Sequence, residues 1–124
     1  MTLPNHLRYT ADHEWLHIDS EIVTVGITAF AADSLGDIVF VDLPAVGSTV
    51  VTGQPCGEVE STKSVSNLYA PVDGKIVEIN QEVVDTPGLI NTDPFNMGWL
   101  FRVAFSAAPE LLDAAAYEAL IGGS

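Results

Sequence analysis

The sequence predicts a single mainly β domain over residues 1–124, a flattened barrel/sandwich hybrid of two pseudo-symmetric β units, with a short helix near 28–36 and a C-terminal helix. Two observations predict this class. A chain of 124 residues with 48% hydrophobic content is long enough for one compact core and too short for two ordinary domains. Most of it consists of short β-branched runs separated by Gly, Pro and Asn, which is typical of all-β sandwiches and barrels.

Seven segments carry the strand pattern, and the turn residues between them set their ends. Each is rich in β-branched or aromatic residues, which favour extended backbone. The predicted strands lie within 21–27, 37–43, 48–53, 56–61, 64–70, 74–80 and 98–105.

Two segments instead have helical character. In the first, Thr28 can cap the start and Gly36 can supply the left-handed residue at the end. The second is a C-terminal helical segment at about 107–122, with Pro109 placed for the first turn and Gly122 as the stop.

A weak internal repeat supports the two similar β units. Gly36 and Gly74 each open a Gly-x-Ile-Val segment, and each copy closes on a Val-Val pair followed by a glycine. Lys63 lies between the copies, near the centre of the predicted pseudo-twofold arrangement.

Lys63 is one of only two lysines and falls at the bend between two predicted strands. Strand alternation predicts that Val59 faces inward and that Val65 does so again after the bend. This leaves a hairpin tip at 62–63, although Thr-Lys is a poor choice for the tightest two-residue turns, which favour Gly, Asn or Asp. A turn sequence that departs from this residue preference suggests that the turn at 62–63 serves a function.

A lysine displayed at a rigid tip offers an amine that a modifying enzyme can acylate. Acylation removes the charge and turns the side chain into a tether for a carried group. The alternative is an ordinary solvated lysine, which is how we interpret Lys75 at the start of its strand.

The charge of the chain excludes several kinds of partner. Seventeen carboxylates against four basic residues give a formal net charge of -13, which argues against nucleic acid and against anionic membranes. Basic protein surfaces are the expected counterparts, although acidity also keeps a small monomer soluble. Cys56 is the only cysteine, so no intramolecular disulfide or multi-cysteine zinc site is expected.

The stretch "HEWLH" at 13–17 satisfies the H-E-x-x-H pattern of zinc proteases. That chemistry needs both histidines on one helical face, whereas this stretch runs into a β-like segment in which His13, Trp15 and His17 alternate with Glu14. We therefore predict half-exposed strand histidines and no metal site. A hydrolase would instead predict zinc in the purified protein.

Seven stretches spread over nearly the whole chain carry a family resemblance. They are "HEW" at 13–15, "VGIT" at 25–28, "LGDIVFVDLP" at 35–44, "VES-K" ending at Lys63, "YAPVDGKIVEIN" at 69–80, "PGLIN" at 87–91 and "GWLFRV" at 98–103. In this order they resemble the glycine cleavage system H protein family, among the lipoyl and biotinyl carrier domains.

The resemblance implies that Lys63 carries covalent lipoate as its N6-lipoyl attachment site. It also implies that Glu60, Ser61, Thr62 and Ser64 form the recognition hairpin. Biotinyl carriers place methionines on both sides of the lysine, so the flanking Thr62 and Ser64 favour lipoate. The family more often has Val and Ala at these two positions.

The resemblance also gives Glu14 a possible role, in a cleft that receives the loaded arm. There its carboxylate could pair with the cationic amine of a carried aminomethyl group. Without the resemblance, a solvated strand glutamate would be the ordinary interpretation.

By resemblance, the protein is a shuttle of the glycine cleavage system and not an enzyme. It would carry the aminomethyl group from a pyridoxal phosphate glycine decarboxylase to a tetrahydrofolate-dependent aminomethyltransferase, and dihydrolipoyl dehydrogenase would reoxidise it. A lipoate-attaching enzyme is a fourth implied partner. The alternative function is a lipoyl donor or relay carrier for other lipoate-dependent complexes.

The first fifteen residues lack the features of a secretory signal and of a transit peptide. We therefore expect a cytoplasmic, bacterial-type monomer that spans no membrane; a mature mitochondrial form would have a similar sequence.

Overall fold

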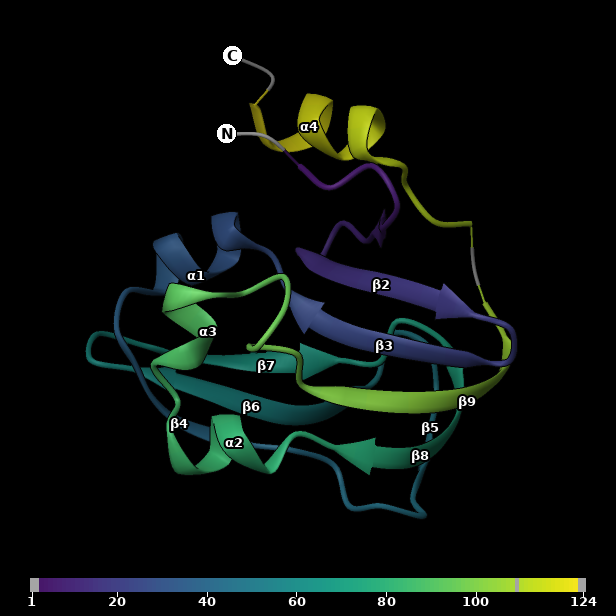
Figure 1. Ribbon diagram of the computed structural model, residues 1–124, viewed down its shortest axis with the longest axis horizontal. Helices are drawn as coiled ribbons and strands as arrows, with labels where there is room; N and C mark the ends of the chain where they lie inside the picture. The colour runs from purple at the N-terminus through teal and green to yellow at the C-terminus, as the bar shows by residue number, and fades with distance from the viewer. Residues whose placement is uncertain (1–2, 109, 123–124) are drawn as a thin grey trace.

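The computed structural model describes residues 3–108 and 110–122, whose strands form two antiparallel sheets (Figure 1). The six-stranded sheet contains, in spatial order, β1 (Arg8–Tyr9), β2 (Glu14–Asp19), β3 (Ile22–Ile27), β9 (Phe101–Ala107), β8 (Asp73–Ile79) and β5 (Thr49–Val50). The three-stranded sheet contains β4 (Ile38–Asp42), β6 (Pro55–Ser61) and β7 (Val65–Tyr69). The predicted mainly β class is confirmed, as a sandwich of two sheets that do not close into one barrel.

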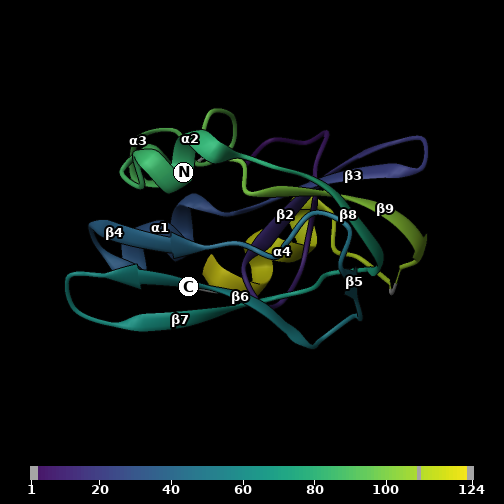
Figure 2. The same cartoon turned by 90° about the horizontal axis from the view of Figure 1, so that it is seen from below.

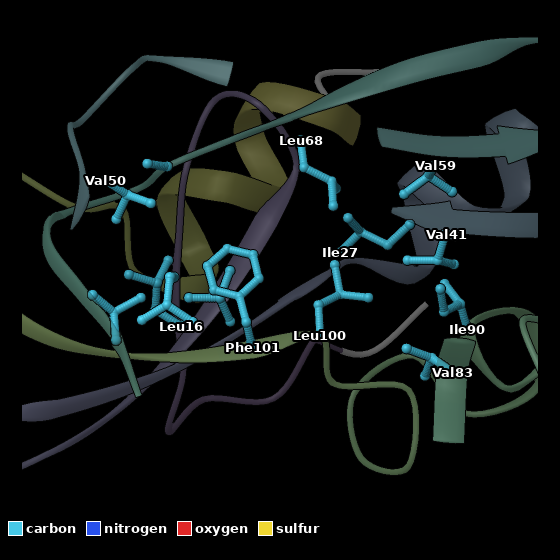
Figure 3. Packing of buried hydrophobic residues seen from close by; sticks show 14 of the residues in the cluster. Leu16, Ile27, Val41, Val50, Val59, Leu68, Val83, Ile90, Leu100 and Phe101 are labelled. Atoms are coloured by element: carbon cyan, nitrogen blue, oxygen red, sulfur yellow. The ribbon is translucent and has the colours of Figure 1, made fainter. Parts of the chain in front are cut away.

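The main core lies between the two sheets and under the short helices (Figure 3). It is made of aliphatic side chains and Phe101, and Cys56 packs against it as a half-buried thiol. Burial, and secondarily the charge of Glu14, raises the pKa of Cys56 to about 12, so the thiol is protonated at neutral pH. Val59 is buried as predicted.

Val65 does not face inward, and that prediction is wrong. Its exposed fraction is 58%. The reason is the register of the hairpin, because Glu60 pairs with Val65 and Val59 pairs with Ser66. Cross-strand partners share a face of the sheet, so Val65 lies on the outer face beside Glu60.

The first predicted helix is confirmed as α1 (Ala29–Leu35). The side chain of Thr28 accepts a hydrogen bond from the backbone N–H of Ala31, and Gly36 ends the helix with a φ of 86°. Only glycine adopts that conformation without strain.

Two further helices, α2 (Gln81–Asp85) and α3 (Leu89–Thr92), were not predicted. The Asn80 side chain caps α2 by accepting from the N–H of Glu82, and Val83 is buried against the core. The internal repeat is therefore limited to its opening strands. Its first Val-Val pair begins with Val50 of β5, whereas the second pair lies in α2.

The C-terminal helix α4 (Ala114–Gly122) begins later than the predicted 107, because β9 continues to Ala107. Before the helix, Leu112 forms a β-bridge with Tyr9. Asp113 then caps α4 by accepting from the N–H of Ala116 at 2.8 Å. Pro109, predicted to begin the helix, lies outside the described residues.

Helix α4 covers the N-terminal segment rather than the main core (Figure 1). A second hydrophobic cluster joins them, made of Leu3, Leu7, Tyr9, Trp15 and Tyr117. None of the helices in the described parts of the chain is both long and apolar enough to cross a bilayer.

Candidate functional site

Lys63 lies in the turn that joins β6 to β7, and its side chain is exposed. In both views of the ribbon, this turn projects from the end of the molecule that also carries α1 (Figures 1 and 2). No carboxylate of the described residues is within ion-pair distance of its ammonium group. The structure therefore presents the lysine as an accessible amine at the end of a stiff hairpin.

The turn is held by the hydroxyl of Ser61 rather than by a glycine. Ser61 Oγ accepts from the backbone N–H groups of Lys63, at 3.3 Å, and Ser64, at 3.1 Å. The N–H of Ser61 also donates to the carbonyl of Ser64 at 2.8 Å. Ser61 itself is buried, so water has limited access to its hydroxyl. These hydrogen bonds explain how Thr62 and Lys63 occupy a bend that usually favours Gly or Asn.

A second segment braces the turn from the side. The N–H of Thr62 donates to the carbonyl of Asp37 at 3.1 Å, between α1 and β4. The side chain of Asn91, in α3, fixes that segment at both ends. Its Nδ2 donates to the carbonyl of Gly36 at 2.8 Å, and its Oδ1 accepts from the N–H of Ile38 at 2.9 Å. The position of the turn thus depends on α3.

The stem of Lys63 lies against Gly36. A Cβ atom built on Gly36 would be 3.4 Å from Lys63 Cε, so the missing side chain leaves room for the methylenes. The positive φ is what requires glycine here, since a Cβ at this distance would make only an ordinary van der Waals contact with the lysine stem.

A small cavity lies beside this end of the molecule, between α1 and β7. Its walls come from both sheets and include Glu14, Ile27, Leu35, Val59 and Ser66. Its volume is about 40 Å³, the share of roughly one water molecule in the liquid. Leu35, which lines the cavity, directly precedes Gly36, the residue that the lysine stem lies against.

Glu14 is the buried acid of this cavity, with an exposed fraction of 3%. Burial, reinforced by the nearby charge of Asp12, raises the pKa of Glu14 to about 8, although hydrogen bonds from Thr10 and from the backbone of Tyr69 oppose the shift. The carboxyl is therefore largely neutral at pH 7. A cation brought into the cavity would favour its ionised form.

The wall of the cavity is tied to α4 by Tyr117. Its hydroxyl lies 2.8 Å from Thr28 Oγ1, at the cap of α1, and 2.9 Å from Nδ1 of His13. Burial raises the pKa of Tyr117 and lowers the pKa of His13, so both groups are neutral near pH 7.

The "HEWLH" stretch does not form a helical metal site. Glu14 to His17 lie in strand β2, and His13 precedes the strand with a φ of 67°. His13 is half-buried against Tyr117, whereas His17 is exposed near His6. The described residues contain no group of three or more metal-ligating side chains.

The structure places all the residues of the predicted hairpin, Glu60, Ser61, Thr62, Lys63 and Ser64, in or directly beside the turn. It also brings Glu14 into a cavity that reaches the same end of the molecule. Asn91 and Tyr117 were not singled out from the sequence. Asn91 lies in the quoted stretch "PGLIN", which is the one signal that could have drawn attention to it.

Comparison with known proteins gives a consistent answer. The chain matches the family described as "Glycine cleavage H-protein" over residues 7–122. It is 54% identical over 123 residues to a glycine cleavage system H protein of Beutenbergia cavernae, covering 99% of each chain. It is 55% identical over 124 residues to that of Thermobifida fusca, covering 99% of this chain and 98% of the relative.

A solved structure is equally similar. The crystal structure of a glycine cleavage system H protein from Mycobacterium marinum superposes with a TM-score of 0.94 at 51% identity. The match covers 97% of this chain and 99% of that one.

Proposed function

The chain belongs to the glycine cleavage H-protein family, and on this premise we propose that it carries its lipoyl group on Lys63, in amide linkage to Nζ. The protein is a lipoyl-bearing shuttle of the glycine cleavage system. The observation that supports Lys63 as the attachment residue is its exposure in a turn fixed by Ser61 and Asp37.

The surroundings of Lys63 suit a covalent tether. Its amine has no carboxylate partner among the described residues, so acylation breaks no ion pair. Gly36 leaves space for the stem, and the braced turn gives the arm a fixed origin. When bound, the lipoyl dithiolane supplies the disulfide that accepts the carried group and is later reoxidised.

Glu14 is proposed to receive the cationic end of the carried group. The neutral, buried carboxyl would give up its proton when a cation enters, and the resulting ion pair would be shielded from water. Because the cavity now has room for only about one water molecule, the arm requires α1 to move away from β7. Ala31 and Leu35 supply the α1 wall of the cavity, and residues 66–68 supply the β7 wall.

The partners follow from membership in the glycine cleavage system. We propose glycine decarboxylase as the donor, the tetrahydrofolate-dependent aminomethyltransferase as the acceptor and dihydrolipoyl dehydrogenase as the enzyme that restores the disulfide. A lipoate-attaching enzyme acts before them. The chain is the carrier component of the system, and we propose that it has no catalytic activity and acts as a monomer in the bacterial cytoplasm, since the relatives compared are bacterial.

Intact-mass analysis tests the attachment residue. We expect protein made in lipoate-supplied cells to gain a lipoyl-sized mass that peptide mapping places on Lys63. Lys63→Arg should lose the increment, because arginine keeps the charge and offers no acylable amine. Lys75→Arg is the matched control and should keep it. An increment that persists in Lys63→Arg would refute the assignment.

A further inference from the structure

The outer face of the three-stranded sheet is apolar next to the Lys63 turn. Phe40 of β4 pairs with Glu60 of β6, and Glu60 pairs with Val65 of β7, so the three side chains form one row across the face. The exposed fractions of Phe40 and Val65 are 53% and 58%, and Val39 beside them is 51% exposed. We call Val39, Phe40, Glu60 and Val65 the tip face.

The tip face is not explained by the packing of the domain. Val39 lies where the register between β4 and β6 shifts, and such bulges often re-aim side chains near functional sites. Large apolar side chains gathered on an open sheet surface are an aggregation hazard unless a partner covers them. Here they lie on the last cross-strand row before the lysine turn.

Apart from Lys63 itself, the charges on the strands of the tip face are negative. The next row on the same face contains Asp42, Glu58 and Asn67, all exposed. Strands β4, β6 and β7 contain no arginine or lysine. A complementary partner therefore has an apolar centre with arginines or lysines at its edge.

The position of the lysine amine indicates which partner this is. An enzyme that uses the finished arm meets it at its far end, away from the protein body. An enzyme that builds the arm must bring its reacting centre to Nζ itself, at the end of a four-carbon stem that lies against Gly36. Its surface then has to cover the side chains that flank the turn.

We propose that the tip face is the docking surface for the enzyme that acylates Lys63, an inference that rests on the proposed function. In that reaction the unprotonated Nζ forms an amide C–N bond with the acyl carbon of an activated lipoyl donor, an acyl-adenylate made from lipoate and ATP. The bond from that carbon to the adenylate oxygen breaks with its electron pair, and the amine proton passes to a base of the enzyme. The tip face binds the enzyme and takes no part in the bond changes.

Steady-state kinetics with a purified lipoate–protein ligase, lipoate and ATP test the proposal. The variant Phe40→Thr with Val65→Thr removes the apolar row but keeps β-favouring side chains. The lost contacts stabilise the ground state and the transition state equally. The KM for the carrier should therefore rise roughly tenfold, while kcat stays within about twofold of the native value. The matched control is Val77→Thr with Met97→Thr, which changes two other exposed apolar residues, 42% and 46% exposed, and should leave both constants unchanged.

The outcomes separate this inference from the proposed function. If Lys63→Arg is modified as fast as the native protein, the attachment site is wrong and the proposed function fails. If modification requires Lys63 but the KM of the tip-face variant matches that of the control, the docking surface is wrong. A variant that is lipoylated normally but is a poor substrate for a glycine cleavage enzyme would also overturn the proposal, since the face would serve another partner.

Discussion

At the scale of single residues, Glu14 is a buried acid with no ion-pair partner among the residues that the structure describes. Its folded pKa of about 8 lies above the ordinary value of 4.5, so the folded protein binds more protons than the unfolded chain between these two values. The free energy of unfolding therefore falls as pH rises through this window. The contribution of the protonated Glu14 carboxyl to the free energy of unfolding is fully present below about pH 4.5 and is lost above about pH 8.

We predict that Glu14→Gln removes this pH dependence. The variant keeps the shape of the side chain without an ionisable group, so its stability relative to the native protein should increase from pH 5 to pH 9 by about 4 kcal/mol. Urea unfolding at both pH values measures the difference. Glu58→Gln, at an exposed position on β6, is the control. If the stability of Glu14→Gln falls with pH as steeply as that of the native protein, the buried carboxyl does not cause the pH dependence.

At the scale of secondary-structure elements, the lysine hairpin depends on α3 through Asn91. We predict that Asn91→Ala lowers the free energy of unfolding by about 2 kcal/mol, because the carbonyl of Gly36 and the N–H of Ile38 each lose a partner. The Thr62 amide, which donates to Asp37, should exchange with deuterium faster than the loss of global stability alone explains. Urea unfolding and amide exchange by NMR measure the two effects.

Two further variants sharpen this test. Asn91→Asp keeps the acceptor for Ile38 and loses the donor to Gly36, so its effect should be intermediate. Asn96→Ala changes the same residue type at an exposed site and should have little effect. If Thr62 exchange rises only in proportion to global destabilisation, then Asn91 does not position the turn.

The hydroxyl group of Tyr117 links helix α4 to the cavity wall. We predict that Tyr117→Phe lowers the free energy of unfolding by about 1–2 kcal/mol, since Thr28 Oγ1 and His13 Nδ1 lose their shared partner in a buried site. The ring remains stacked on Tyr9, 4.8 Å away, so packing is preserved. Leu120→Ala, at an exposed position of the same helix, should be close to neutral in the same denaturation experiment.

The elements differ in how well the sequence could predict them. α1 was predictable because Thr28 and Gly36 act locally on its two ends. α2 was not predictable, because Val83 and Val84 favour strands. The helix is stabilised instead by the burial of Val83 and by the cap at Asn80. The lysine turn could be found from its own residues. Its brace could not, because Asn91 is separated from Gly36 in sequence and joined to it only by the fold.

At the scale of the whole molecule, the β6–β7 turn displays Lys63 on a strongly acidic body. Seventeen carboxylates and four basic residues give a formal net charge of -13. A field of this sign repels anionic surfaces and attracts basic ones over distances set by the ionic strength. Asp42, Glu58 and Glu60 of the three-stranded sheet lie near the turn, so this field is directed where the partner enzymes must approach.

We therefore predict that partner encounter is salt-dependent. Raising the ionic strength from about 0.01 M to about 0.15 M shortens the Debye length from about 30 Å to about 8 Å. The kcat/KM of dihydrolipoyl dehydrogenase for the reduced, lipoylated protein should then fall about tenfold, while kcat stays nearly constant, because steering acts on association. Free dihydrolipoamide, which is uncharged, is the control substrate and should show no such fall. Equal salt responses for the two substrates would mean that salt acts on the enzyme's own chemistry, and that the acidity of the carrier serves solubility rather than recognition.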